Sequence, residues 1–179
     1  MRNKNSRPRR LAVAGIVGAA YAVLTIILAP ISYGAVQLRV SEVLCILPYF
    51  IPGTAWGLFA GCAIANVLTG NVFDIVFGSL ATLGAALVTA ALGKRRHTPV
   101  NQLLACFQPV VFNALIVGAV ITGAYEGMNL FRNPAAFALN ALWVGLGELA
   151  VMFLLGYPLM RFLPSLKSFR ELTEPYDRM

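Results

Sequence analysis

The sequence predicts an all-α integral membrane protein, and three observations support that fold class. The 179 residues are 59% hydrophobic and only 12% charged, about half the charged fraction of an ordinary soluble domain. The apolar residues form runs of about 20, the length that crosses a bilayer as a helix. Basic residues gather in short segments beside these runs, as in cytoplasmic loops. Composition therefore excludes soluble enzymes, secreted disulfide scaffolds and disordered chains.

The positions of the basic residues indicate which segments face the cytoplasm rather than a binding partner. Of the 14 Lys and Arg residues, 12 lie in residues 1–10, 94–96 and 161–178. The rest of the chain carries Arg39 and Arg132 against four acids, which are Glu42, Asp74, Glu126 and Glu148. The net charge of +7 therefore follows the positive-inside rule and does not indicate nucleic-acid binding.

The spans follow from the apolar runs and from charge parity. The runs cover residues 11–29, 41–69, 72–92, 103–124 and 135–162. If residues 1–10 and 94–96 are both cytoplasmic, an even number of spans separates them. The run 41–69 is therefore split at Pro52-Gly53, because this pair breaks helices. The result is six transmembrane helices with both termini in the cytoplasm.

This topology gives one membrane domain with three parts. Residues 1–10 form a basic N-terminus, residues 11–162 form the six-helix bundle, and residues 163–179 form a cytoplasmic tail. The segments 30–40, 70–71 and 125–134 then face outside. The acids of the spans accordingly lie near the outer half, which favours a neutral or cationic ligand.

Small residues recur at a spacing of four in the first and third predicted helices. The first helix carries Ala14, Gly18 and Ala22, and the third carries Gly57 and Gly61. Such residues let helices approach closely in lipid. Internal packing is favoured for the third helix. For the first helix, internal packing and contact with another protein are equal alternatives.

Acidic side chains inside the apolar runs are candidate ligand contacts, because an ionisable group in a bilayer is costly unless it is paired or solvated. Arg39 can pair with Glu42 or with Asp74, so these three form either a structural ion-pair set or a ligand site. Glu148 has no partner close by in the sequence. It is either a ligand contact or a protonated structural group.

Several uncharged side chains extend this candidate site. Asn140 and Trp143 precede Glu148 on adjoining faces of the last helix. An indole, an amide and a carboxylate together suit a flat ring with hydrogen-bonding edges. Asn66 and Asn113 are lone amides in apolar helices, and each is either an interhelical hydrogen bond or a ligand contact.

Catalytic and metal-binding patterns are missing from the sequence. The three cysteines are isolated within apolar runs, and His97, the only histidine, lies beside the basic segment 94–96. HExxH and GxxxxGK[ST] do not occur, and no Ser/His/Asp set can be assembled. We therefore expect no metal, no cofactor and no enzymatic activity.

Four short motifs together resemble the QueT family. They are Gln37-Leu-Arg39-Val-Ser41-Glu42, Leu47-Pro48, Gly61-Cys62-x-x-Ala65-Asn66 and Asp74-x-x-x-Gly78-Ser79-x-Ala81-Thr82. The resemblance extends over most of residues 11–162. Members of this family are taken to be substrate-binding S components of energy-coupling factor (ECF) transporters for queuosine precursors.

The resemblance implies an S-component-like bundle in a prokaryotic plasma membrane that captures a queuosine precursor from outside. A transmembrane coupling subunit and two cytoplasmic ATPase subunits would drive uptake. The coupling subunit would dock on Ala14, Gly18 and Ala22. The implied substrate-binding residues are Gln37, Arg39, Glu42, Asn66, Asp74, Asn113, Asn140, Trp143 and Glu148.

Among the precursors, preQ1 suits these residues better than the uncharged preQ0, because its aminomethyl group is cationic and the outer half is acidic. Queuine is a further candidate. An S component for another vitamin-like substrate is the main alternative, and a membrane scaffold or membrane enzyme is the second.

Overall fold

The computed structural model describes residues 6–33, 37–95 and 98–177, and these residues form helices without a strand. Four helical segments of this described part are long and apolar enough to span a membrane: Arg7–Ile27, Asp74–Gly93, Pro99–Tyr125 and Pro134–Ser165. Two shorter apolar helices cover Val40–Tyr49 and Thr54–Thr69. The predicted all-helical membrane protein is confirmed. The count of six spans and the cytoplasmic side of the termini stay predictions.

The first half of the bundle contains the predicted break at Pro52-Gly53. This pair lies in the turn between a ten-residue 3₁₀-helix and the following α-helix. The elements in order are α1 (Ser6–Ile27), α2 (Ala29–Ser32), η1 (Val40–Tyr49), α3 (Thr54–Asn66) and η2 (Val67–Thr69).

Single π-helical turns interrupt three of the long segments in the second half. The elements are η3 (Asp74–Gly78), α4 (Ser79–Gly93), α5 (Pro99–Val120), η4 (Ile121–Tyr125), α6 (Pro134–Val151), η5 (Met152–Gly156), α7 (Tyr157–Phe162), η6 (Leu163–Ser165) and α8 (Lys167–Asp177). The turns η3, η4 and η5 are the π-helical ones. Helix α5 begins with a sequence-encoded cap, because the Thr98 hydroxyl accepts a hydrogen bond from the Asn101 amide at 3.3 Å and Pro99 follows the cap.

Helices α1 and α3 pack backbone to backbone through their small residues. A Cβ built on Gly18 would lie 2.4 Å from the Gly57 carbonyl oxygen, and one on Gly57 would lie 2.0 Å from that of Ala14. A Cβ on Gly61 would lie 2.2 Å from the Gly18 oxygen. Only glycine permits this approach, so the stripe predicted in α3 does serve internal packing.

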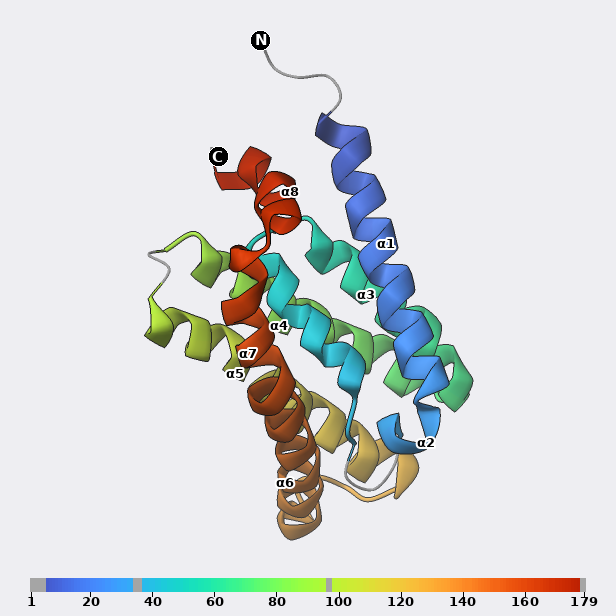
Figure 1. Ribbon diagram of the computed structural model, residues 1–179. Helices are drawn as coiled ribbons and strands as arrows, with labels where there is room; N and C mark the ends of the chain where they lie inside the picture. Colours follow the sequence, from blue (N-terminus) through green and yellow to red (C-terminus); the bar gives the residue numbers. More distant parts are fainter. Residues whose placement is uncertain (1–5, 34–36, 96–97, 178–179) are drawn as a thin grey trace.

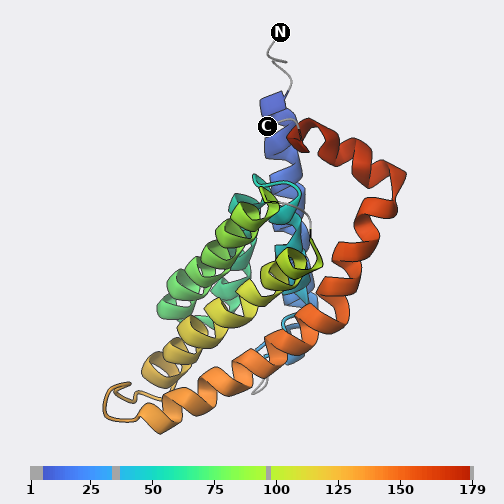
Figure 2. The ribbon, with the colours of Figure 1, turned by 90° about the vertical axis from the view of Figure 1, so that its left-hand side faces the viewer.

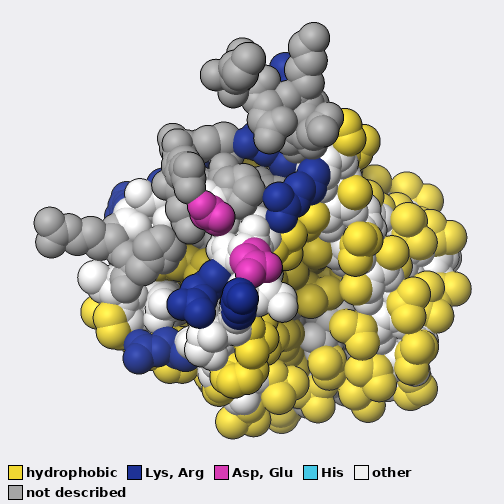
Figure 3. Space-filling view, turned by 45° about the horizontal axis from the view of Figure 1, so that its top comes forward, with side chains coloured by type: hydrophobic (Ala, Val, Ile, Leu, Met, Phe, Trp, Pro, Cys, Tyr) yellow, Lys and Arg dark blue, Asp and Glu magenta, His cyan; other side chains and the backbone are white. Residues whose placement is uncertain are grey.

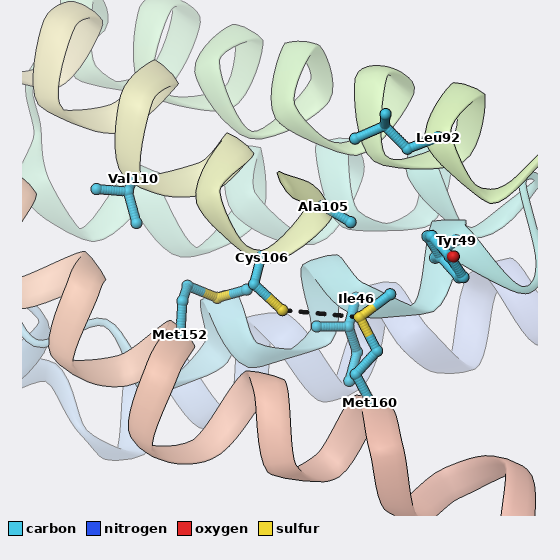
Figure 4. Close-up of a cluster of buried hydrophobic side chains, with 8 residues drawn as sticks. All are labelled: Ile46, Tyr49, Leu92, Ala105, Cys106, Val110, Met152 and Met160. Carbon is cyan, nitrogen blue, oxygen red and sulfur yellow. Dashed lines mark hydrogen bonds between the residues drawn. The ribbon is translucent and has the colours of Figure 1, made fainter. Parts of the chain in front are cut away.

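A hydrophobic cluster joins η1, α4, α5, η5 and α7. Cys106 of α5 and Met160 of α7 meet with their sulfur atoms 3.7 Å apart (Figure 4). Ile46 and Tyr49 of η1 and Met152 of η5 complete the same buried group. This cluster ties the short 3₁₀-helix to the last long segment.

Helix α1 begins and α8 ends at the same end of the molecule (Figures 1 and 2). Lys and Arg side chains gather there, with hydrophobic side chains around them (Figure 3). Helix α8 folds back on the bundle, because the rings of Phe169 and Phe50 lie 5.3 Å apart. The parts of the basic segments at residues 1–5, 96–97 and 178–179 lie outside the described residues.

Candidate functional site

A cavity of about 630 Å³ is lined by residues of the first half of α6 and of the segments beside it. Helix α6 begins at the end of the bundle opposite to the start of α1 (Figure 1). The volume of the cavity lies in the range of small-molecule sites. The segments around it are the end of α2, η2, the two π-helical turns η3 and η4, and the first turns of α6. Its lining residues are Tyr33, Gln37, Leu68, Thr69, Asp74, Ile121, Tyr125, Glu126, Leu139, Asn140 and Trp143.

The lining of the cavity includes the carboxylate of Asp74 and the indole ring of Trp143. The Tyr125 hydroxyl donates a hydrogen bond to Asp74 Oδ2 at 3.5 Å, which joins η3 to η4. Asn140 Nδ2 donates to Thr122 Oγ1 at 3.0 Å, which fixes the amide. Trp143 is 43% exposed, so its ring is open for stacking. A flat polar solute would thus meet an acid, an amide and an indole.

Tyr33 joins the cavity wall to a buried cation. Its hydroxyl donates to the Ala65 carbonyl at 2.9 Å, and its ring centroid lies 5.4 Å from the Arg39 guanidinium carbon, within cation–π range. Burial raises the pKa of Tyr33 to about 12. The phenol is therefore a neutral hydrogen-bond donor at physiological pH.

Arg39 is almost completely buried, with 2% of its surface exposed. Its Nη1 lies 3.8 Å from Cys62 Sγ, while Nε and Nη2 have no hydrogen-bond partner. Glu42 and Asp74 interact with it through their charges. Among the described residues, however, Arg39 forms no direct ion pair with either acid, so the ion-pair set considered from the sequence does not form.

The carboxylate of Glu42 accepts hydrogen bonds from the side chains of three other residues. Its Oε1 accepts hydrogen bonds from the Tyr21 hydroxyl and, at 3.1 Å, from Thr82 Oγ1. Its Oε2 accepts from Cys45 Sγ at 3.0 Å. Both carboxylate oxygens are therefore occupied from within the chain, and the residue connects α1, η1 and α4.

Glu148 has a different environment. Its Oε1 accepts a hydrogen bond from Asn113 Nδ2 at 2.9 Å, whereas its Oε2 and the Asn113 Oδ1 have no partner. Asn66 repeats this pattern: its Nδ2 donates to the Asp74 carbonyl at 3.1 Å, and its Oδ1 has no partner. All three side chains are buried.

The structure thus separates the predicted binding residues into two groups. Four of them, Gln37, Asp74, Asn140 and Trp143, line the cavity. The other five, Arg39, Glu42, Asn66, Asn113 and Glu148, are buried behind its wall. Tyr21 and Thr82, the partners of Glu42, were not among the predicted residues, although both interrupt apolar helices and Thr82 belongs to the family-like motif.

The predicted docking residues occupy a different place from the one expected. Ala14, Gly18 and Ala22 are buried in α1, and the first two contact α3 directly. The exposed face of α1 instead carries the small residues Gly15 and Ala19. Docking on α1 stays a prediction, and in this structure a partner would reach that exposed face first.

No group of three or more His, Cys, Asp and Glu side chains is placed to hold a metal ion within residues 6–33, 37–95 and 98–177. The polar atoms of the predicted binding residues are amides, carboxylates and one guanidinium, and Tyr33, Thr69 and Tyr125 add hydroxyls to the cavity lining. Groups of this kind can form hydrogen bonds with an organic solute.

Fold and site together define an all-helical integral membrane protein with a solute-sized cavity at one end, lined by both apolar and polar side chains. Comparison with known protein families identifies the family of the chain. The family described as QueT transporter matches residues 11–165, and the chain belongs to this family. It is also 37% identical over 82 residues to a protein named Queuosine precursor transporter QueT from Lactococcus lactis subsp. cremoris (strain MG1363).

That alignment covers 45% of this chain and 48% of the lactococcal protein, so it spans about half the length of each. No solved structure matches the chain.

Proposed function

We propose that this protein is the substrate-binding S component of an ECF importer for a queuosine precursor. Membership in the QueT transporter family and the name of the lactococcal relative support the substrate class. The sequence lacks a nucleotide-binding motif, which is in keeping with ATP hydrolysis in separate subunits. In the proposed six-helix topology, with both termini in the cytoplasm, the cavity lies on the outer side of a prokaryotic plasma membrane.

The observation that carries the proposal is the pairing of Asp74 and Trp143 in one solute-sized cavity. A 7-deazaguanine ring is flat and stacks on an indole. The aminomethyl group of preQ1 is cationic and is attracted to the Asp74 carboxylate across a short, partly buried distance. Gln37 and Asn140 provide amide groups for the remaining polar atoms. The charge of the cavity therefore favours preQ1 over preQ0.

The proposed energising subunits would bind through α1. Gly15 and Ala19 lie on its exposed face together with Ile16 and Val23, and a Cβ on Gly15 would meet nothing within 4 Å. A second membrane helix can approach closely at such small residues. This face therefore replaces Ala14, Gly18 and Ala22 as the proposed contact with the coupling subunit.

The test is binding of preQ1 and preQ0 to the purified protein, measured by tryptophan fluorescence or calorimetry. We expect Asp74→Asn to weaken preQ1 about 10- to 100-fold, because it removes a charge-assisted contact, and to leave preQ0 nearly unchanged. Glu171→Gln, on α8 at the opposite end and 65% exposed, is the matched control. Equal losses for both ligands would contradict the role of Asp74, and no binding of either would contradict the substrate class.

A further inference from the structure

We infer that a buried set of polar side chains behind the cavity reads the guanine-type edge of the substrate. This set, called the inner polar group here, consists of Arg39, Asn113 and Glu148. The inference rests on the proposed function for the substrate class. It adds which atoms of the ring are recognised and which of the two buried glutamates recognises them.

The inner polar group offers unused hydrogen-bonding atoms of both kinds. Arg39 has two N–H positions without partners, at Nε and Nη2, and the acceptors without partners are Asn113 Oδ1 and Glu148 Oε2. None of the three residues is more than 2% exposed. Leaving a buried polar atom without a partner destabilises the fold, so several at one place are a large cost for a protein of ordinary stability. Such atoms mark a place where a ligand completes the hydrogen bonding.

Helix α6 links the three residues of the inner polar group, because it contacts both α5 and the segment that leads to Arg39. The Asn113 amide bonds Glu148 directly at 2.9 Å. On the other side, the segment leading to Arg39 touches α6 immediately before Glu148, because a Cβ on Gly147 would lie 2.6 Å from the Gln37 carbonyl oxygen. Glu148 also interacts with Arg39 through its charge. The segment that carries the donors of Arg39 therefore packs on the helix that carries the acceptor Glu148.

The group is joined to the cavity at two points. Arg39 lies against the ring of Tyr33, which lines the cavity. Glu148 follows Asn140, which lines the cavity, by eight residues on α6, which is about 12 Å along the helix axis and about 80° around it. A ring that enters past Tyr33 with its edge first would thus approach Arg39 and the inner polar group.

The order of donors and acceptors matches a guanine-type edge. That edge presents a carbonyl oxygen, then a ring N–H, then an amino group. Arg39 can donate to the carbonyl, while Glu148 Oε2 accepts from the ring N–H and Asn113 Oδ1 accepts from the amino group. An adenine-type edge presents an amino group and a ring nitrogen lone pair instead. It would place a donor against Arg39 and a lone pair against the carboxylate, which is unfavourable at a buried site.

Glu42 is excluded from this role by its own contacts. Its two oxygens already accept hydrogen bonds from Tyr21, Thr82 and Cys45. A ligand would have to break these bonds to reach it. Of the two glutamates that the sequence offered for the ring edge, the structure assigns Glu148.

The experiment measures binding of four related bases to the purified full-length protein. They are preQ1, 7-deazaguanine, 7-deazahypoxanthine, which lacks the amino group, and 7-deazaadenine, whose edge is reversed. We expect 7-deazaguanine to bind about 10- to 100-fold more tightly than 7-deazaadenine. The variant Glu148→Gln should lose about 10- to 100-fold for preQ1 and 7-deazaguanine, because the added amide hydrogens face ring donors. Glu42→Gln is the matched control and should keep the wild-type ligand order.

The outcomes separate this inference from the proposed function. If preQ1 binds but the wild-type protein binds 7-deazaguanine and 7-deazaadenine equally tightly, the inference is wrong and the transport proposal stands. Equal effects of Glu148→Gln and Glu42→Gln on all ligands would likewise overturn the inference. If no deazapurine binds the wild-type protein, both fall. Because the wild-type series needs no variant, a misfolded variant would not prevent the test.

Discussion

Two buried glutamates lie close enough to interact electrostatically, yet they have opposite hydrogen-bonding states. Glu42 has both oxygens occupied, while Glu148 keeps one oxygen without a partner. The sequence identifies both as costly groups in an apolar run, because any ionisable residue there is conspicuous. It cannot distinguish them, since the partners Tyr21, Thr82 and Asn113 come from helices far away along the chain.

This difference predicts a stability effect for Glu42. Glu42→Gln replaces one acceptor oxygen with a donor amide and leaves at least one of the Tyr21, Thr82 and Cys45 contacts unmade. We expect a loss of about 1–3 kcal/mol in the free energy of unfolding. Thermal unfolding in detergent measures it. An unchanged melting temperature would show that Glu42 is not the structural link between α1, η1 and α4.

At the scale of elements, the positions of the helices could be predicted from local sequence signals, but the helix types could not. Hydropathy and the Pro52-Gly53 pair indicate two helices between residues 40 and 69, and both are present. Residues 41–51, before the break, are fewer than the roughly 20 that cross a bilayer as an α-helix. As a 3₁₀-helix of ten residues, the segment reaches about 20 Å, compared with about 15 Å as an α-helix. The turns η3 and η4, which border the cavity, left no recognised sequence signal, because π-helical turns have no strict motif.

The α1–α3 contact and the exposed face of α1 predict different effects for a glycine-to-leucine substitution. Gly57→Leu, in α3, would place a side chain against the Ala14 carbonyl 2.0 Å from the new Cβ, and should destabilise the fold by about 3 kcal/mol. Gly15→Leu meets open space and should leave unfolding unchanged while it weakens assembly with the coupling subunit. Thermal unfolding and co-purification measure the two effects. If Gly15→Leu assembles normally, the exposed face of α1 is not the contact.

At the scale of the whole molecule, the two ends of the bundle differ, and the positions of the charges and of the cavity indicate the same orientation in the membrane. Helix α1 begins and α8 ends at the same end, where the basic side chains gather (Figure 3). The cavity lies at the other end. The sequence indicates this orientation through the positions of Lys and Arg. The cavity itself was beyond sequence reasoning, because its walls come from five segments whose relative placement depends on tertiary packing.

This orientation predicts which positions an impermeant thiol reagent reaches in intact cells. Phe131, in the segment before α6, is 97% exposed, and Ser168, in α8, is exposed at the opposite end. Phe131→Cys should be labelled in intact cells, and Ser168→Cys only after permeabilisation. The native Cys45, Cys62 and Cys106 are buried, so the unsubstituted protein is the control. Labelling of Ser168→Cys alone in intact cells would invert the orientation. Labelling of both would place the two ends on one side and contradict six spans.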